Sequence, residues 1–344
     1  MKIWFDFTNV PHAHFLSVII KYFFDKHNVF CTARDFAELR GLLTEKNIDF
    51  KMAGKHHRNK FLKPFASLKR YFKLCREVSA FDLSISCGSY EATFFSKIKG
   101  KKTIVFDDND ISPNWLYARF TDYFICPSKF NINGIVRQGI PRQNIFSYDG
   151  YKEDIYLADY APDPEFLNKL PFKEYVVIRP ENLSATYIKG KDKKSLAPAL
   201  LKKLVSDGNS IVFLPRYNQE IEYAQGLKNV HIPPDILNGL YLCFYAKAVF
   251  TGAGTFAREA ACLGVPAVSF FPGTKLLSVD KDMINKGWLF HSRNIDDIIK
   301  YFAEFKRREF NVERCKEVQK EVFVILNKIL EKINEPFLNS TARR

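Results

Sequence analysis

Short apolar runs alternate with segments of helical spacing along the first part of the chain. Segments rich in apolar residues predict strands at residues 3–7, 29–33, 48–52, 83–86, 103–106 and 123–126. Between them, apolar residues that recur every three or four positions predict helices at 14–26, 36–46, 63–78 and 91–97. This alternation is typical of βαβ units, in which helices cover both faces of a parallel sheet.

A polar stretch at residues 149–165, which contains Gly150, Pro162 and Pro164, predicts a domain boundary. Beyond it the alternation begins again, with strands expected at 175–178, 210–214, 248–251 and 267–270 and helices at 196–205, 256–263 and 312–333. We therefore expect an α/β protein with two Rossmann-like domains, residues 1–155 and 156–311. Their parallel sheets would face a central cleft, and a C-terminal helix and tail would follow at 312–344.

The composition excludes several classes of protein. Hydrophobic residues make up 47% and charged residues 26% of the 344 residues, which is the balance of a globular chain. The longest apolar run, 240–246, is far shorter than the ~20 residues that cross a bilayer. The seven cysteines form no CxxC pair, so we expect reduced core thiols and no metal site. The first residues predict a strand rather than a signal peptide, which favours a cytoplasmic protein.

Basic residues are concentrated in one segment. Residues 51–80 contain nine Lys or Arg and one acid, Glu77, and so carry +8 of the net charge of +14. Apolar residues at helical spacing lie among the cations, namely Phe61, Phe65, Leu68 and Phe72 beside Lys63, Lys69, Arg70 and Lys73. One interpretation is an exposed helix that lies on an anionic membrane. Another is a helix whose apolar stripe packs into the core, and nucleic-acid binding is a third, although no recognised motif accompanies it.

The segment 251–266 combines a predicted strand end, the sequence Gly-Ala-Gly-Thr and an immediate helix start. Gly252 and Gly254 would let the backbone approach a ligand, and the helix N-terminus beside Thr255 suits a phosphate. Glu259, one helical turn further on, could accept hydrogen bonds from ribose hydroxyls. The alternative is a tight turn with a solvated Glu. A nicotinamide fingerprint is excluded because Ala257 replaces its third glycine.

Two arginines follow predicted strands in the second half. Arg179 comes directly after the strand at 175–178, and Arg216 follows the strand at 210–214. Ligands of open parallel sheets bind beyond the carboxyl ends of the strands, so both side chains could meet a diphosphate. The alternative is that each is a surface arginine at a strand end.

Candidates for acid–base chemistry lie in the first half. His12 and His14 follow the first strand, and we expect a general base, a structural role or, with a further ligand, a metal contact. Asp107 and Asp108 follow another strand and could bind sugar hydroxyls or serve as the base; the alternative is a polar loop. At a further strand–helix junction, Ser89 is a candidate helix N-cap.

The sequence resembles the GT-B glycosyltransferases and the related UDP-N-acetylglucosamine 2-epimerases. Gly-x-Gly-Thr, Glu-Ala and Leu-Gly-Val-Pro within 251–266 carry this resemblance. Residues 1–15, Phe106-Asp107-Asp108 and Arg179-Pro180-Glu181 are similar to an uncharacterised GT-B-like family of about this length, first noted in archaea. The chain departs from many relatives at residues 8–14, where Thr-Asn-Val-Pro-His-Ala-His replaces a Gly-rich turn.

The resemblance implies a nucleotide-sugar bound mainly by the second domain. The implied donor contacts are Arg179, Arg216, Ile232, Gly252, Gly254, Thr255 and Glu259, with the segment around Ile232 beside the nucleobase. The expected acceptor or sugar contacts are Gly88, Ser89, Glu91 and Asp107, and the catalytic candidates are His12, His14 and Asp108.

We therefore expect a glycosyltransferase that moves a sugar from a UDP-linked donor to a glycan or lipid-linked acceptor, in cell-surface polysaccharide synthesis. The alternative is a 2-epimerase of UDP-N-acetylglucosamine, and a nucleic-acid-binding protein is a third hypothesis that leaves the Gly-x-Gly-Thr turn unexplained. We expect no cofactor and no nucleic-acid partner. The basic segment 51–80 would allow peripheral attachment to the inner face of the cell membrane.

Overall fold

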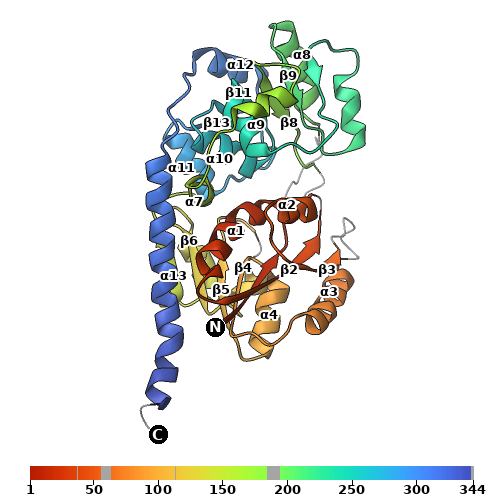
Figure 1. Ribbon diagram of the computed structural model, residues 1–344. Helices are drawn as coiled ribbons and strands as arrows, with labels where there is room; N and C mark the ends of the chain where they lie inside the picture. The colour runs from red at the N-terminus through yellow and green to blue at the C-terminus, as the bar shows by residue number, and fades with distance from the viewer. Residues whose placement is uncertain (37, 56–62, 113, 184–193, 342–344) are drawn as a thin grey trace. The chain divides into compact units, whose positions relative to one another are not determined.

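The computed structural model describes residues 1–36, 38–55, 63–112, 114–183 and 194–341. The chain forms two compact units (Figure 1). The first unit comprises Met1–Ala158 and Arg314–Arg344, and the second unit comprises Asp159–Glu313. Each unit is an α/β structure built on one parallel sheet, as the alternation of strands and helices predicts.

The sheet of the first unit contains seven parallel strands within the described residues, in the order β3-β2-β1-β4-β5-β6-β7. Six of the seven match predicted apolar runs, and β7 was not predicted. The strands are β1 (Lys2–Phe7), β2 (Asn28–Asp35), β3 (Lys51–Lys55), β4 (Leu83–Cys87), β5 (Lys102–Phe106), β6 (Tyr123–Pro127) and β7 (Ile145–Tyr148).

Helices cover both faces of this sheet (Figure 1). The helices are α1 (Val10–Phe24), α2 (Leu39–Glu45), α3 (Lys63–Glu77), α4 (Tyr90–Ile98), α5 (Trp115–Ala118), α6 (Ile132–Arg137) and α7 (Lys152–Leu157), with a short 3-10 helix η1 (Arg142–Asn144). Helix α1 packs beside α2 and α7, whereas α3 packs beside α4, and α4 beside α5. Trp4 lies in the core under α3 and α4, where its ring meets Phe81 and Phe95 edge-on.

Helix α1 begins four residues earlier than its apolar spacing predicts. Asn9 caps it by accepting a hydrogen bond from the backbone N–H of Val10, and Pro11 lies in its first turn. Proline is favoured there because the first helical N–H groups have no partner within the helix. His12 and His14 therefore lie on a helix and not in a loop.

A buried ion-pair cluster fixes α3 and α4 to the sheet. The Arg70 guanidinium donates to both carboxylate oxygens of Asp6 at 2.7 and 2.8 Å, pairs with Glu91 at 3.1 Å and donates to the carbonyl of Ala53 at 3.0 Å. Its side chain is only 1% exposed. The expectation that Arg70 belongs to an exposed basic face is wrong, because its position on α3 points to the sheet together with Leu74. Phe61 of the predicted stripe lies outside the described residues.

The second unit repeats the architecture with six parallel strands in its described part, in the order β10-β9-β8-β11-β12-β13. The strands are β8 (Val176–Arg179), β9 (Ile211–Phe213), β10 (Val230–His231), β11 (Ala248–Thr251), β12 (Ala267–Ser269) and β13 (Leu289–His291). The helices are α8 (Ala197–Ser206), α9 (Gly239–Tyr245), α10 (Gly254–Cys262), α11 (Ser278–Asn285) and α12 (Ile295–Glu304), with 3-10 helices η2 (Pro164–Lys169) and η3 (Asn218–Ala224). Residues of α8 and α12 share one apolar core with the sheet, and α10 packs beside α9 and α11.

The last helix, α13 (Val312–Thr341), returns to pack on the first unit. Tyr22 of α1 stacks on Phe323 with ring centroids 4.0 Å apart, and its hydroxyl donates to Asn327. At the other end of the contact, Arg314 pairs at 2.5 Å with the buried carboxylate of Asp154. No helix in the described part of the chain is both long enough and apolar enough to cross a membrane.

Candidate functional site

Both sheets change direction at a topological switch point. In the first unit the chain forms β1, β2 and β3 outward and then returns to place β4 on the other side of β1. In the second unit β8, β9 and β10 run outward before β11 pairs with the free side of β8. Open parallel sheets bind ligands beyond the carboxyl ends of the strands at such points. The candidate residues lie at these two edges, one in each unit.

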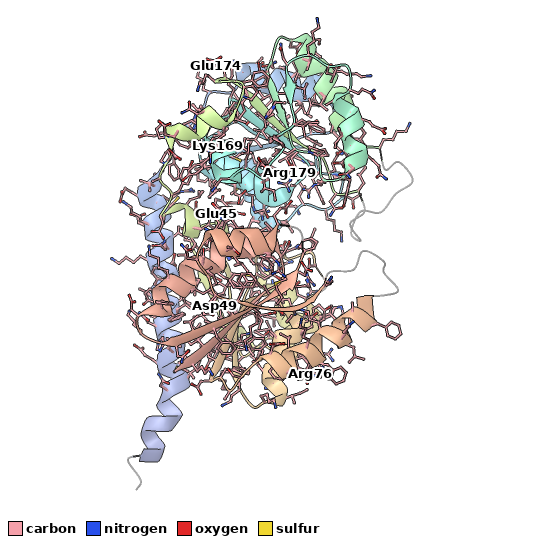
Figure 2. All side chains as sticks on the ribbon, turned by 45° about the vertical axis from the view of Figure 1, so that its right-hand side comes forward. Glu45, Asp49, Arg76, Lys169, Glu174 and Arg179 are labelled. Atoms are coloured by element: carbon pink, nitrogen blue, oxygen red, sulfur yellow. The ribbon has the colours of Figure 1, made fainter. Side chains whose placement is uncertain are left out.

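Arg179 is the last residue of β8, directly at the switch point of the second unit (Figure 2). In register it lies opposite Thr251, the last residue of β11, and its carbonyl accepts the N–H of Gly252 at 3.0 Å. Its guanidinium lies 5.6 Å from the ring centroid of Phe256. The buried Nε has no hydrogen-bond partner among the described residues, and no carboxylate of those residues lies in ion-pair distance. A guanidinium at a switch point that pairs with none of these carboxylates can bind an anionic ligand through its terminal nitrogens.

The N-terminus of α10 lies beside Arg179. Ala253 is its N-cap residue and offers no capping side chain, so the first N–H groups of Gly254, Thr255 and Phe256 have no acceptor within the helix. These N–H groups and the helix dipole suit a phosphate. Gly252 is needed for packing: a Cβ there would lie 2.5 Å from the Cα of Glu181.

Helix α10 is anchored by a buried ion pair that sequence reasoning missed. Arg258 donates to Asp280 of α11 at 2.8 Å and to the hydroxyl of Thr255 at 3.3 Å. Glu259, one turn after Thr255, is buried at 7% exposure. The structure therefore brings Arg179, Gly252, Gly254 and Thr255 together at one sheet edge and places Glu259 on the same helix.

Arg216 and Ile232 follow the outer strands of this sheet. The Nε of Arg216 donates at 2.8 Å to the carbonyl of Pro180, the residue after Arg179. This bond holds the Arg216 side chain against the loop that leaves β8. Ile232 directly follows β10, two strands away from β8, and packs half-buried on the apolar core. Arg216 thus joins the Arg179 edge, and Ile232 lies farther along it.

Asp107 follows β5 in the first unit and is held in an unusual electrostatic environment. Its Oδ2 accepts a 2.5 Å hydrogen bond from the Tyr117 hydroxyl, and its Oδ1 accepts the N–H of Asn109 at 2.9 Å. Burial and the neighbouring charge of Asp108 raise the pKa of the Asp107 carboxyl from 3.8 to about 6. Gly88, with φ +62°, passes over this pair, and a Cβ there would lie 3.4 Å from the Tyr117 ring and 3.6 Å from Asp107 Oδ2.

Asp108 forms a buried ion pair with Lys152. The ammonium group lies 2.8 Å from Oδ2, and the two side chains are 9% and 11% exposed. Lys152 begins α7, just after β7, so both residues lie at the carboxyl edge of the sheet. Lys152 was not predicted as a site residue, because β7, the strand that precedes it, was not predicted. The turn Asp149-Gly150, which separates β7 from α7, is the feature of the sequence that indicates this strand–helix junction.

His12 and His14 lie in the first turns of α1. Burial and the charge of Lys152 lower the pKa of His12 from 6.5 to about 3, and burial and Lys46 lower the pKa of His14 to about 3. The His12 Nδ1 lies 3.3 Å from the Thr8 hydroxyl, whereas His14 stacks on Tyr156 of α7. Both imidazoles are therefore neutral at pH 7, and His12 belongs electrostatically to the group around Asp108.

Ser89 and Glu91 lie in the Arg70 cluster. The Ser89 hydroxyl donates to Asp6 at 2.5 Å and accepts the N–H of Ala92, so Ser89 is the N-cap of α4 as predicted. Glu91 is 4% exposed, pairs with Arg70 and accepts from Ser67. Both side chains are occupied inside the unit, which gives them a structural role there. Within the described chain, no group of three or more His, Cys, Asp or Glu is arranged to hold a metal ion.

Two units with parallel sheets and switch-point sites define the GT-B class of fold. The UDP-GlcNAc 2-epimerase of Methanocaldococcus jannaschii, solved with UDP-GlcNAc and UDP, has a TM-score of 0.69 at 14% identity over 95% of this chain and 100% of its own. The UDP-N-acetylglucosamine 2-epimerase of Rickettsia bellii has a TM-score of 0.73 at 14% identity over 97% and 98%. The glycotransferase of kitacinnamycin has a TM-score of 0.61 at 10% identity over 96% and 98%.

Residues 1–334 match the family described as "Protein of unknown function (DUF354)", and the chain belongs to that family. An uncharacterised protein of Methanocaldococcus jannaschii is 28% identical over 320 residues, which cover 88% of this chain and 91% of that protein. The resemblance to a GT-B-like family with an archaeal member is thereby confirmed.

Proposed function

We propose that the protein is a nucleotide-sugar enzyme of the GT-B class, which binds a nucleoside diphosphate sugar, UDP-linked, in its second unit. One observation carries the proposal: Arg179 lies at the switch point beside the uncapped N-terminus of α10. A cation and a set of backbone N–H groups at one sheet edge are what a diphosphate requires. The names of structurally similar proteins, which include UDP-GlcNAc 2-epimerases and a glycotransferase, support this ligand class.

In this proposal each donor contact has a distinct role. Arg179, Arg216 and the N–H groups at Gly254 and Thr255 stabilise the charge that develops on the leaving diphosphate. Glu259 accepts hydrogen bonds from the ribose hydroxyls, and the backbone near Ile232 contacts the nucleobase. Gly252 keeps the turn close to the loop after β8.

We assign proton transfer to Asp107. A catalytic base works best when its pKa lies near the working pH, and the carboxyl with a pKa of about 6 is mostly ionised and still basic at pH 7. His12 and His14, with pKa values of about 3, are weaker bases. We propose that His12, His14 and Asp108 contact the sugar or the acceptor beside Gly88. Pairs of titratable groups with pKa values pushed apart are typical of acid–base sites.

The reaction we propose is glycosyl transfer to a hydroxyl of a glycan or lipid-linked acceptor. The acceptor oxygen attacks the anomeric carbon, and the bond from that carbon to the diphosphate oxygen breaks. The hydroxyl proton passes to the Asp107 carboxylate, and the nucleoside diphosphate leaves with the bonding electron pair. The Asp107 group and the cationic donor residues lie at the switch-point edges of different sheets.

A 2-epimerase of UDP-GlcNAc is the second candidate, favoured by one observation. A carboxyl with a pKa of about 6 is present in both protonation states near neutrality, as removal and return of a proton at C2 require. Both reactions would use the same contacts to the nucleotide-sugar donor.

Incubation with UDP-GlcNAc alone separates these reactions. An epimerase yields the C2-inverted sugar, visible by NMR, and in D₂O deuterium enters at C2. A transferase gives no inverted product and releases UDP from a UDP-sugar only slowly until an acceptor is added. A panel of UDP-, GDP- and CMP-sugars, each measured by calorimetry, tests the shared premise, and binding of none of them would refute it. In the same panel Arg179→Ala should bind the nucleotide-sugar more weakly than the parent protein, and Lys300→Ala, which removes a charge at an exposed site on α12, is its matched control.

A further inference from the structure

The outward half of α3 carries large apolar side chains exposed to solvent. Phe65 is 73% exposed, Leu68 53% and Phe72 58%. They recur at positions i, i+3 and i+7, so they form one row along the helix. The core-packing interpretation of this stripe is wrong, because the side chains that pack inward are Arg70 and Leu74.

Three cations flank the apolar row. Lys69, Lys73 and Arg76 are exposed on the adjacent side of the same helix, and Arg76 lies near its C-terminal end (Figure 2). Between residues 65 and 76 the helix has no acid, and Glu77 pairs with Lys51 of β3 at 3.9 Å. We call Phe65, Leu68, Lys69, Phe72, Lys73 and Arg76 the α3 surface.

The apolar part of the α3 surface continues onto α4, which lies beside α3 (Figure 1). The Tyr71 ring contacts both Phe72 and Phe94, with centroids 5.9 and 5.6 Å away. Phe94 is 40% and Ile98 57% exposed. Exposed apolar side chains that adjoin one another in this way mark an interaction site, whereas single ones need no explanation.

The α3 surface is held in place by the buried Arg70 cluster on the opposite side of the helix. Arg70 joins α3 to β1 through Asp6 and to α4 through Glu91. The exposed row is therefore presented by a fixed helix, not by a segment that must order on binding. Preorganisation of this kind lowers the entropic cost of docking.

We propose that the first unit docks through the α3 surface onto an anionic lipid bilayer. Phenylalanine and leucine beside a row of Lys and Arg is the pattern of helices that lie in the bilayer interface. The apolar row would enter the boundary of the acyl chains, and the three cations would meet anionic headgroups. An apolar protein partner would not require the cations, and a nucleic acid would not require the exposed phenylalanines.

Flotation with lipid vesicles tests this docking without any use of the enzymatic activity. At low salt the full-length protein should float with vesicles of phosphatidylcholine and phosphatidylglycerol and should float far less with phosphatidylcholine alone. Raising the salt to about 1 M should reduce binding, because the Debye length falls to about 3 Å. Failure to float with the anionic vesicles at low salt would overturn the proposal, whatever else the surface binds.

Two sets of variants locate the contact. Replacing Lys69, Lys73 and Arg76 together by Gln should lower partitioning about a hundredfold, since each cation near the surface contributes about 1 kcal/mol. The control is a triple Gln variant at Lys281, Lys300 and Lys306, exposed lysines of the second unit that change the net charge equally. Equal losses in both triples would show that only net charge matters and would overturn the assignment to α3.

The apolar row needs a variant of its own. Leu68→Gln with Phe72→Gln should lower partitioning about a hundredfold or more, because burial of each side chain contributes about 1.5–3 kcal/mol. Phe24→Gln, at a residue 68% exposed on α1, should leave partitioning unchanged. Normal partitioning of the Leu68 and Phe72 variant would overturn the proposal in favour of a purely electrostatic contact.

Discussion

Asp107→Asn should gain stability relative to the parent protein as the pH rises. The Asp107 carboxyl has a pKa of about 6 in the folded unit against an ordinary value of 3.8. Between these two pH values the folded state binds more protons than the unfolded state, so the stability contributed by this group is lost as the pH rises. A pKa of about 6 in place of 3.8 corresponds to a loss of about 3 kcal/mol of stability above pH 7, and the asparagine side chain does not titrate.

The pH dependence, not the absolute stability, is the quantity to measure. Asparagine keeps an acceptor for Tyr117 but loses one of the two oxygens that Asp107 uses, which shifts stability equally at every pH. Between pH 4.5 and pH 8 the variant's free energy of unfolding should rise by about 2 kcal/mol relative to the parent. Urea titrations would follow Trp4, which is fully buried in the first unit, in chains with Trp115→Phe and Trp288→Phe.

Asp25→Asn supplies the matched control. Asp25 is exposed at the end of α1 in the same unit and lies outside the buried Asp107 group, so its replacement tests whether the loss of any one carboxylate reproduces the effect. If the curves for Asp107→Asn and the parent run parallel from pH 4.5 to pH 8, folding does not raise the pKa of the Asp107 carboxyl and its assignment as the proton-transfer group loses its basis.

Three further substitutions test other parts of the account. Arg70→Met should lower the free energy of unfolding by about 3–5 kcal/mol, because it leaves Asp6 and Glu91 buried without their cation, whereas Lys69→Met should change it by less than about 0.5 kcal/mol. If Arg70→Met and Lys69→Met both change the free energy of unfolding by only a small amount, the Arg70 ion pairs do not stabilise the unit. Gly252→Ala should cost about 1–3 kcal/mol, because its Cβ would overlap Glu181, whereas Gly41→Ala on α2, with open space around it, should not destabilise. Urea titration measures the free energy of unfolding of both pairs of variants, those at Arg70 and Lys69 and those at Gly252 and Gly41. Glu259→Gln should weaken UDP and uridine about tenfold alike in calorimetry, since both carry the ribose, and a loss confined to UDP would exclude the ribose role.

Strands in the middle of the sheets were predictable because parallel strands buried on two faces leave short apolar runs in the sequence, as in β8, β9 and β11. The exceptions lie at sheet edges. Strands β7 and β13 have only one fully buried residue each, Tyr148 and Leu289, and β10 is two residues long. Such strands bury too little to leave an apolar run in the sequence.

The donor-side residues could be proposed because each follows a predicted strand, and the topology then places the ends of β8 and β11 side by side. Ion-pair partners that are far apart in the sequence could not be predicted in this way. Asp6 and Arg70 are 64 residues apart, and the pairing of Asp108 with Lys152 spans 44. A local pattern does not encode such pairs. One local signal was available for Arg70, which shares a helix face with Leu74, one turn further on, opposite Phe65 and Phe72.

Titration calorimetry with UDP and uridine, on the parent protein and on Arg179→Ala, tests the nucleotide-sugar proposal most directly. The parent should bind UDP, and the variant should bind it at least tenfold more weakly, because a hydrogen bond from a charged donor contributes about 1.5–3 kcal/mol. Uridine binding, which involves no phosphate, should be the same in both proteins, and Lys300→Ala should behave as the parent. No UDP binding by the parent, or equal losses of UDP and uridine in Arg179→Ala, would contradict the account.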